Sequence, residues 1–397
     1  MSPGRRGVEK IFHVASSEDI LKGKVTDVYF TNVVKALNRL GRNPRVAAEV
    51  RAGSLPDGWE WAVFAGLEEA LQLLRGHDVD VYAMPEGTLF GPEDTVLLLE
   101  GPYLEFAVLE TALLGFLCQA SGVATKAARC RVAAGDRLLL SFGARRMHPA
   151  ITPMIERNAY IGGCDGVSVV ASAELIGEKP LGTMSHSLML CVGDEVEAFR
   201  AFDESADAYI RRVALVDTFQ DEKFGALTAV EALGDRLFAV RLDTPSSRRG
   251  DFLKILREVR WELDLRGYGA VKLFVSGGLD ENDILRYNPY ADAYGVGTSI
   301  SNAPVVDYSL DIVEVDGEPR AKRGKMSGRK QVYRCSSCGA TLLAPWDAPR
   351  PACSCGGDTT PLLIRVLSGG EPCAETPRPQ EIRERVLAQL RGRTLSA

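Results

Sequence analysis

Residues 237–278 contain the pattern that decides the fold. They read LFAVRLDT (237–244), then RRGDFLKILREVRWELDLRG (248–267), then VKLFVSGG (271–278). The outer two segments are short runs rich in apolar and β-branched residues, which is typical of buried strands, and the middle segment has helical apolar spacing. A strand, a helix and a second strand in this order predict two parallel strands joined by a crossover helix.

The same rhythm extends along much of the chain. Five further segments are predicted strands or strand ends: RLLLSFG (137–143), GVSVVAS (166–172), GTMSH (182–186), VALVDTF (213–219) and AYGVGTS (293–299). Most of these strands end in residues suited to chemistry, and a closed β/α barrel brings such ends together at one face. An open sheet would place its ligand at a single switch point. We therefore predict the α/β class with an irregular parallel β/α barrel.

Two regions flank the predicted barrel, which occupies residues 110–304 and begins with a long buried helix. Residues 1–109 contain three candidate strands and predict an N-terminal α+β domain. We expect residues 305–328 to rejoin this domain through a hairpin with an Asp-Gly turn. Residues 329–397 hold a cysteine cluster and a charged helix, and predict a small C-terminal zinc-binding domain.

Composition limits the class of protein. The 397 residues suit two or three domains, and 46% hydrophobic with 25% charged residues is ordinary for a soluble globular chain. The net charge of −6 gives no support for general nucleic-acid binding, so an anionic substrate must be held by local positive groups. We find no apolar run of membrane length and no secretory signal, and scattered cysteines favour a reducing cytoplasm.

Four of the nine cysteines form the strongest chemical motif. Cys335 and Cys338 are separated by two residues, and Cys353 and Cys355 by one. Four thiolates at short spacing are the donor set of tetrahedral structural zinc, although the second pair is tighter than usual. The alternative is four reduced thiols without a metal. We predict one structural Zn²⁺ with no part in catalysis.

Glycines at two late strand ends are candidates for phosphate binding. Gly277 and Gly278 follow one strand, and Gly295, Gly297 and Thr298 follow the next. Barrels often hold a phosphate in these loops, where backbone N–H groups must approach closely. Tight barrel turns would need the same glycines, so the pattern alone leaves both interpretations open.

Acidic strand ends are the second kind of candidate. Asp217-Thr218 and Asp243-Thr244 could accept hydrogen bonds from ribose hydroxyls or hold Mg²⁺ at a pyrophosphate, while capping of the next helix is the alternative. Arg241 lies in a position where the barrel interior should be apolar, so we expect it to face the cavity mouth.

Arginines and one histidine complete the set of candidates. Arg145 and Arg146 follow Phe142; arginine binds carboxylate or phosphate in bidentate fashion, and an adjacent aromatic ring can stack on a planar substrate. Surface arginines beside a core phenylalanine are the alternative. His186 lies at a candidate strand end, where an imidazole could transfer protons or accept a phosphoryl group, or could be a packed polar residue.

Together these residues resemble the nicotinate phosphoribosyltransferase family, in particular its archaeal-type members with a cysteine-rich tail. The resemblance runs from Thr26 to about Lys330, and the tail matches that subgroup. Six short motifs carry it, in the family's order: Thr26-Asp27-Val28-Tyr29, Phe142-Gly143-Ala144-Arg145-Arg146, Thr183-Met184-Ser185-His186, Arg241-Leu242-Asp243, Ser276-Gly277-Gly278 and Gly295-Val296-Gly297-Thr298.

The resemblance implies roles for these residues. Tyr29 and Phe142 would stack on opposite faces of a pyridine ring, with Tyr29 supplied by a neighbouring subunit. Arg241 and Asp243 would meet the pyridine substituent and the ribose. His186 would be the residue that ATP phosphorylates. The other candidates are Arg145, Thr183, Ser276, Gly277, Gly278, Gly297 and Thr298 for substrate binding, and Asp217 beside the histidine.

The resemblance also implies the reaction. Nicotinate and phosphoribosyl pyrophosphate (PRPP) would give nicotinate mononucleotide and pyrophosphate for NAD biosynthesis, with hydrolysis of ATP and with Mg²⁺ accompanying PRPP and ATP. A homo-oligomer with shared active sites would be the working form, without nucleic acid or membrane partners.

Two other functions remain in view. A quinolinate phosphoribosyltransferase would have a related fold, but its substrate has two carboxylates, so its pocket should be richer in arginine and lysine. It would also not need His186. A zinc-ribbon binding protein would use the tail to contact RNA or protein, and the acidic pI of about 5.5 argues against it.

Overall fold

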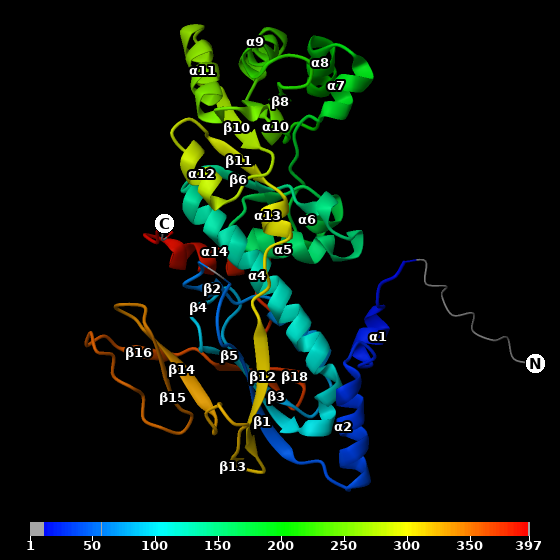
Figure 1. Ribbon diagram of the computed structural model, residues 1–397, viewed down its shortest axis with the longest axis vertical. Helices are drawn as coiled ribbons and strands as arrows, with labels where there is room; N and C mark the ends of the chain where they lie inside the picture. Colours follow the sequence, from blue (N-terminus) through cyan, green and yellow to red (C-terminus); the bar gives the residue numbers. More distant parts are fainter. Residues whose placement is uncertain (1–11, 57, 396–397) are drawn as a thin grey trace, which may run out of the picture. The chain divides into compact units, whose positions relative to one another are not determined.

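The computed structural model describes residues 12–56 and 58–395, and its contacts divide them into two compact units (Figure 1). Of the described residues, those within 1–86, 90–119 and 306–376 form unit 1, and those within 87–89, 120–305 and 377–397 form unit 2. The cysteine cluster therefore packs with unit 1 and the terminal helix with unit 2. The division into three domains made from the sequence stays a prediction, because contact density does not test which segment folds alone.

Unit 1 is built on a seven-stranded antiparallel sheet. Its strands, in spatial order, are β13 (Glu318–Pro319), β12 (Tyr308–Val315), β1 (Arg45–Ala52), β5 (Thr95–Pro102), β3 (Asp80–Ala83), β17 (Ile364–Ser368) and β18 (Glu371–Pro372). The β12–β13 hairpin turns at Asp316 and Gly317, whose φ angles of 50° and 83° are those that a tight two-residue hairpin requires. Residues after the barrel thus return to pair with β1, in the register Val46 to Val315.

Several smaller elements complete unit 1. They are the helices α1 (Ser17–Leu21), α2 (Val28–Arg39) and α3 (Leu67–Leu74), the 3₁₀ turns η1 (Tyr103–Glu105) and η2 (Ala107–Leu109), the short strand β2 (Ala62–Val63), and the three-stranded sheet of β15 (Thr341–Pro345), β14 (Lys330–Cys335) and β16 (Thr359–Pro361). Of the short strand β4 (Leu89–Phe90), Leu89 is assigned to unit 2 and Phe90 to unit 1. The core of unit 1 includes Val50, Phe64, Leu97 and Leu98, all fully buried.

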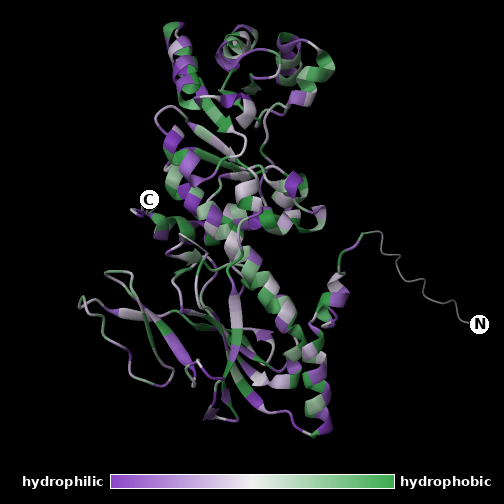
Figure 2. Ribbon diagram, viewed as in Figure 1, coloured by the Kyte–Doolittle hydropathy of each residue, from purple (hydrophilic) through white to green (hydrophobic). Residues whose placement is uncertain are grey.

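Helix α4 (Glu110–Ala134) was predicted as a long buried helix, and it contributes to both cores. Leu113 and Leu117 pack in unit 1, while Val123 and Ala127 pack in unit 2. The expectation that no apolar run reaches membrane length is corrected here: the helical stretch Ala107–Ala134 is long and apolar enough to span a membrane by length and composition (Figure 2). Half of its most apolar window is buried inside the protein, and a core helix passes the same criterion.

Unit 2 contains a six-stranded parallel sheet. Its strands, in spatial order, are β7 (Gly166–Val167), β6 (Leu138–Ser141), β11 (Ala293–Val296), β10 (Lys272–Ser276), β9 (Ala239–Leu242) and β8 (Val213–Leu215). The prediction of the α/β class with a parallel sheet is confirmed. The helices are α5 (Thr152–Ile161), α6 (Val170–Ile176), α7 (His186–Val192), α8 (Glu195–Ser205), α9 (Glu222–Leu233), α10 (Ser246–Arg249), α11 (Phe252–Leu265), α12 (Glu281–Tyr287), α13 (Thr298–Ser301) and α14 (Pro379–Leu390), with 3₁₀ turns η3 (Ala144–Arg146), η4 (Pro149–Ile151) and η5 (Gly234–Arg236).

The interpretation of residues 182–186 as a seventh strand is wrong. This segment joins the two edges of the sheet instead of pairing along either one. Leu181 N–H donates to Val167 O at the β7 edge (2.9 Å), and Met184 N–H donates to Val213 O at the β8 edge (3.4 Å). A chain that crosses from one edge to the other cannot keep a ladder register with either, so the barrel is irregular at this point.

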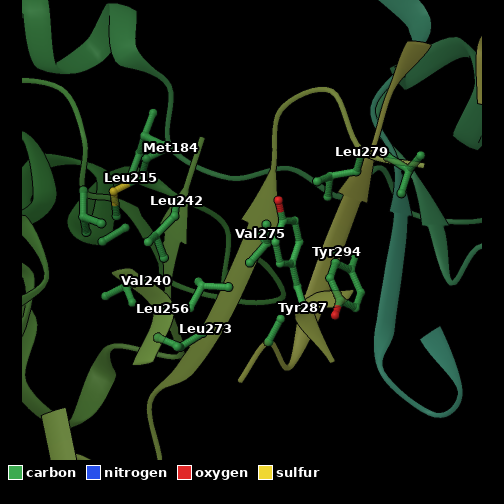
Figure 3. Packing of buried hydrophobic residues seen from close by; sticks show 14 of the residues in the cluster. Met184, Leu215, Val240, Leu242, Leu256, Leu273, Val275, Leu279, Tyr287 and Tyr294 are labelled. Atoms are coloured by element: carbon green, nitrogen blue, oxygen red, sulfur yellow. The ribbon is translucent and has the colours of Figure 1, made fainter. Parts of the chain in front are cut away.

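Successive side chains of a strand point to opposite faces of the sheet, so they alternate between the surrounding helices and the barrel interior. Val240 and Leu242 of β9 pack outward with the helices, as do Leu273 and Val275 of β10 (Figure 3). The intervening residues point inward. Five of them form a small buried cluster inside the barrel: Leu140, Val213, Ala239, Phe274 and Ala293. The same alternation turns Arg241 to the inside.

Candidate active site

A cavity of about 540 Å³ opens at the C-terminal ends of the parallel strands. Of the candidates from the sequence, those that line it are Phe142, Arg145, Arg146, Thr183, His186, Arg241, Asp243, Ser276, Gly277, Gly278, Gly295, Gly297 and Thr298. Two candidates are elsewhere. Asp217 lies directly behind Asp243, and Tyr29 belongs to unit 1, where its side chain is exposed.

Arg241 is held on three sides. Its Nε donates to Ser276 Oγ (2.8 Å), Nη1 donates to Thr183 Oγ1 (2.7 Å), and Nη2 lies 3.0 Å from Asp243 Oδ2. The guanidinium also lies over the Phe142 ring, 5.4 Å from its centroid. Because each Nη carries two hydrogens, Nη2 keeps a donor for a ligand, and the three partners fix its direction.

Asp217 and Asp243 form one connected acidic pair. Asp217 Oδ2 accepts the Asp243 N–H (2.9 Å) and lies 3.1 Å from the Thr244 hydroxyl, while Asp243 Oδ1 accepts the Ser276 hydroxyl (2.6 Å). The other oxygen of Asp217 is buried and has no hydrogen-bond partner among the described residues. Burial raises the pKa of the Asp217 carboxyl, against the opposing effects of the Asp243 N–H and the His186 ring.

His186 stands between a hydroxyl and the two carboxylates. Its Nδ1 is 3.0 Å from Thr218 Oγ1, and its Nε2 is 3.9 Å from Asp217 Oδ1 and 3.7 Å from Asp243 Oδ2. His186 is the first residue of α7, and its side chain is 40% exposed, so the ring remains accessible from the cavity. With a proton on Nε2, which faces the carboxylates, Nδ1 accepts the hydrogen of the Thr218 hydroxyl, so that hydrogen bond must open before Nδ1 can act as a nucleophile.

Two of the glycines are required by backbone conformation. Gly277 and Gly278 have φ angles of 91° and 69°, where side chains are strained. Gly295 is required by space, because an added Cβ would lie 2.3 Å from Cδ2 of the Phe142 ring. These glycines therefore bring backbone close to the cavity, and Gly295 of β11 leaves room for the Phe142 ring.

Two arginines present unpaired charge to the cavity. Arg145 and Arg146 lie on the 3₁₀ turn that follows β6, and both are exposed. Within the described part of the chain, neither forms an ion pair. They are therefore available to an anionic ligand.

Sequence reasoning missed two positioning residues. Arg249 donates to the backbone oxygens of Thr244 (3.0 Å), Ser276 (3.2 Å) and Gly277 (2.7 Å), which ties the ends of two strands together. The local sequence around it, SSRRGD (246–251), is equally typical of a surface arginine, so nothing in it indicated this role.

The second missed residue is Glu156 of α5, which is fully buried. Its carboxylate accepts the N–H groups of Ser168 (3.2 Å) and Val169 (3.0 Å), two residues of the cavity wall. A glutamate next to Ile155, which is also fully buried, was the one available signal. A buried carboxylate needs hydrogen-bond partners inside the protein, and the sequence does not show which groups these are.

The four clustered cysteines of unit 1 meet as predicted. All four Sγ atoms lie within 4.8 Å of one another, and three pairs are 3.4–3.6 Å apart. Tetrahedral zinc with Zn–S bonds of about 2.3 Å requires S–S separations of roughly 3.8 Å, so the donor set fits this ion. An added Cβ at Gly357 would lie 2.7 Å from Cys335 Sγ, so this glycine makes room for the cluster. The nine cysteines include no disulfide.

Comparisons with known proteins identify relatives along most of the chain. The family models described as quinolinate phosphoribosyl transferase, N-terminal domain and C-terminal domain, match residues 27–121 and 123–311. A nicotinate phosphoribosyltransferase of Mycobacterium tuberculosis is 32% identical, over 87% of this chain and 81% of its own length.

Two solved structures share the fold. A nicotinate-nucleotide pyrophosphorylase from Pyrococcus furiosus is 54% identical, with a TM-score of 0.94 over 96% of this chain and 98% of that one. Human nicotinic acid phosphoribosyltransferase has a TM-score of 0.70 over 91% of this chain and 93% of its own, at 23% identity. The family of the M. tuberculosis enzyme is the one that the sequence motifs resembled.

Proposed function

The chain belongs to the nicotinate phosphoribosyltransferase family, and we propose that the cavity of unit 2 joins nicotinate to PRPP. The observation that carries the proposal is the fixed guanidinium of Arg241 beside the Phe142 ring, with two glycine loops and an acidic pair around the same cavity. Within one cavity, the Phe142 ring can stack on a planar substrate, Arg241 can bind a carboxylate, and the backbone of the glycine loops can bind phosphate.

Each part of the substrates has a matching group. The pyridine ring would stack on Phe142, and its carboxylate would take the remaining Nη2 donor of Arg241. The phosphates of PRPP would bind backbone N–H groups of residues 277–278 and 297–298, assisted by Arg145. The ribose hydroxyls would be accepted by Asp243, whose carboxylate lines the cavity.

The chemical step needs little from the protein besides placement. The pyridine nitrogen attacks C1 of the ribose with its own lone pair, and the C1–O bond to pyrophosphate breaks with its electrons leaving on oxygen. No base is required. The side chains align the two reactants, and the backbone donors and arginines stabilise the negative charge that builds on pyrophosphate.

Mg²⁺ that accompanies PRPP has suitable ligands here. The buried, unpartnered oxygen of Asp217 and the carboxylate of Asp243 are hard oxygen donors of the kind that this ion prefers. The ion would neutralise charge on pyrophosphate, while Asp243 would orient the ribose and both carboxylates would orient the His186 ring.

We assign to His186 the role of phosphoryl acceptor. Its Nδ1 would attack the γ-phosphorus of ATP, the bond to the bridging oxygen would break, and ADP would leave. The carboxylates at Nε2 would stabilise the ring, and the Thr218 hydroxyl would guide Nδ1. Later transfer of the phosphoryl group to water would return the histidine. The added charge beside the pyrophosphate site would couple ATP hydrolysis to substrate binding or product release.

The cysteine cluster would hold one structural Zn²⁺ in unit 1, with all four positions taken by protein sulfur and none open for catalysis. A homo-oligomer completes the proposal, because Tyr29 is then available to the cavity of a second copy. The cytoplasm remains the predicted compartment.

One assay tests the function directly. Purified protein is offered nicotinate, nicotinamide or quinolinate, each with PRPP and Mg²⁺, with and without ATP. We expect nicotinate mononucleotide from nicotinate, faster with ATP. Turnover of quinolinate with release of CO₂, and none of nicotinate, would overturn the proposal in favour of the related activity. Quinolinate is a necessary control because three arginines line the cavity, and a substrate with two carboxylates could also bind them.

A further inference from the structure

A second, larger cavity lies at the opposite end of the strands. Its volume is about 850 Å³. Several of its lining residues precede or begin the strands, as do Ile210 and Arg211 before β8, and the segment from Gly177 to Thr183 closes one side. Its apolar wall consists of Leu138, Leu140, Leu181, Val213, Phe238 and Phe274. An apolar cavity of this size is in the range of sites that bind small organic molecules.

Two cations stand at this cavity, each over an aromatic ring. Lys179 Nζ lies 4.6 Å from the centroid of the Tyr209 ring, and the Arg211 guanidinium lies 4.4 Å from that of Phe238. Among the residues that the structure describes, neither cation forms an ion pair. The rings hold both charges near the cavity without neutralising them.

Two carboxylates also line the cavity. Asp165 is paired with two arginines that lie outside the lining, Arg131 and Arg383, at 2.6 Å each. Glu178 Oε1 accepts the Tyr160 hydroxyl (2.9 Å) and the Gln380 amide (3.0 Å), which are neutral donors, so Glu178 keeps its charge. The two unpaired cations outnumber this one carboxylate, so the lining has a net positive charge for a ligand.

The two cavities are physically connected through shared residues. Phe274 of the second cavity stacks on Phe142 of the first, with ring centroids 5.8 Å apart and an interplanar angle of 25°. Gly182 and Thr183 line both cavities, and Thr183 Oγ1 accepts the hydrogen bond that orients Arg241. A ligand in the second cavity would therefore contact Phe274 and Thr183, which position the Phe142 ring and the Arg241 guanidinium in the first cavity.

We propose that the second cavity is a binding site for a small aromatic or apolar anion, and that its occupancy changes ligand affinity in the first cavity. The apolar wall buries the body of the ligand, and Lys179 and Arg211 pair with its carboxylate or phosphate. Phe274 and Thr183 transmit the change. The site adjoins the one proposed for the reaction, with which it shares Gly182 and Thr183.

Binding is tested with 2-naphthoate by calorimetry while nicotinate mononucleotide saturates the first cavity. We expect one equivalent bound per chain, about tenfold weaker binding in Lys179→Gln/Arg211→Gln, and about tenfold weaker binding of neutral 2-naphthol, because the charge-assisted contacts are lost. The control is Arg286→Gln, which removes an exposed cation over Tyr287, away from this cavity. No naphthoate binding in the presence of the nucleotide, or equal loss in the control, overturns the site.

A crystal structure with 6-bromo-2-naphthoate places the ligand through the anomalous signal of bromine. A peak between Lys179 and Arg211 supports the proposal, and a peak only in the first cavity contradicts it. If the nucleotide itself fails to bind, the proposed function fails. The comparison of the double variant with Arg286→Gln still decides the second site.

The coupling has its own measurement. Linkage requires that naphthoate change the affinity for nicotinate mononucleotide by the same factor as the nucleotide changes the affinity for naphthoate. We expect a change of about threefold or more in both titrations. If both ligands bind together and neither changes the affinity for the other, the proposed coupling between the two cavities is wrong.

Discussion

Arg241 illustrates how far single residues could be understood from sequence. It interrupts an apolar strand, and alternation along that strand sets it inside the barrel, where three partners hold it. Asp243 was likewise marked by its place at a strand end, and His186 by its place at the end of a segment that was wrongly taken for a strand. Arg249 and Glu156 were not, because they act through backbone groups of distant loops that only the folded chain brings near.

Asp217 was given several possible roles from the sequence: a partner of ribose hydroxyls, a Mg²⁺ ligand, or a residue beside the histidine. In the structure it lies behind Asp243, with one oxygen accepting that residue's N–H and the other facing His186. A strand-end position predicts proximity to the cavity, but it does not say which of two neighbouring carboxylates lies in front.

The role of His186 leads to the first prediction. Substitution His186→Ala should leave a folded enzyme that forms nicotinate mononucleotide slowly and gains nothing from ATP, because the ring accepts phosphate but takes no part in the C1–N bond. The measurement is the ratio of rates with and without ATP, alongside the melting temperature. His13→Ala, at an exposed histidine of unit 1, is the matched control. Equal ATP stimulation of wild type and His186→Ala would remove this role.

Elements were predictable where their pattern was local. The parallel strands have apolar runs between turn signals, and the hairpin after the barrel has its Asp-Gly turn. The crossing segment at 182–186 was read wrongly as a strand because its composition is that of a strand end. Only the distance between the two edges of the sheet decides that it bridges them.

At the start of α4 the structure predicts a pH effect. Burial raises the pKa of Glu110 to about 7, with a further contribution from Asp311. A carboxyl whose folded pKa is raised is favoured neutral, so the folded state is penalised as pH rises from about 4.5 towards 7. Glu110→Gln should therefore raise the melting temperature relative to wild type at pH 8 and have little effect at pH 4.5.

Glu197→Gln is the control for this prediction, because Glu197 also lies in the first turn of a helix but is exposed. It should show no such dependence. A melting-temperature difference for Glu110→Gln that is constant across this pH range would show that Glu110 ionises normally.

The cysteine cluster predicts a metal-dependent element. Protein purified without chelator should contain about one zinc per chain. Cys335→Ser/Cys338→Ser should lose the metal and melt at a lower temperature, because the four-thiolate cluster cross-links the turns beside β14 and β16. Cys373→Ser, which removes an exposed cysteine outside the cluster, should keep it. Zinc-free protein of full stability would refute a structural site.

At the scale of the whole molecule, the ordered series of motifs carried most of the functional inference. Six short motifs are spread over both units, and those from residues 142 to 298 meet in one cavity of unit 2. Tyr29 belongs to unit 1 and is 56% exposed. A sequence contains no direct record of which copy supplies a residue, so this part of the site rests on the family resemblance.

Complementation tests the shared site. Tyr29→Ala and Phe142→Ala chains should each be nearly inactive, because each removes one ring from the pyridine platform. If subunits exchange freely, mixing them should restore about a quarter of wild-type activity, since half of the dimers are hybrids with one intact site. If hybrids form and the mixture stays inactive, both rings belong to one chain.

The central claim is that the cavity of unit 2 is where nicotinate and PRPP react. A crystal structure with nicotinate mononucleotide and pyrophosphate tests it most directly. The account predicts the pyridine ring on Phe142, its carboxylate bonded to Nη2 of Arg241, and the nucleotide phosphate on the backbone of residues 277–278 or 297–298. A nucleotide bound outside this cavity, or inside it with its carboxylate away from Arg241, would contradict the account.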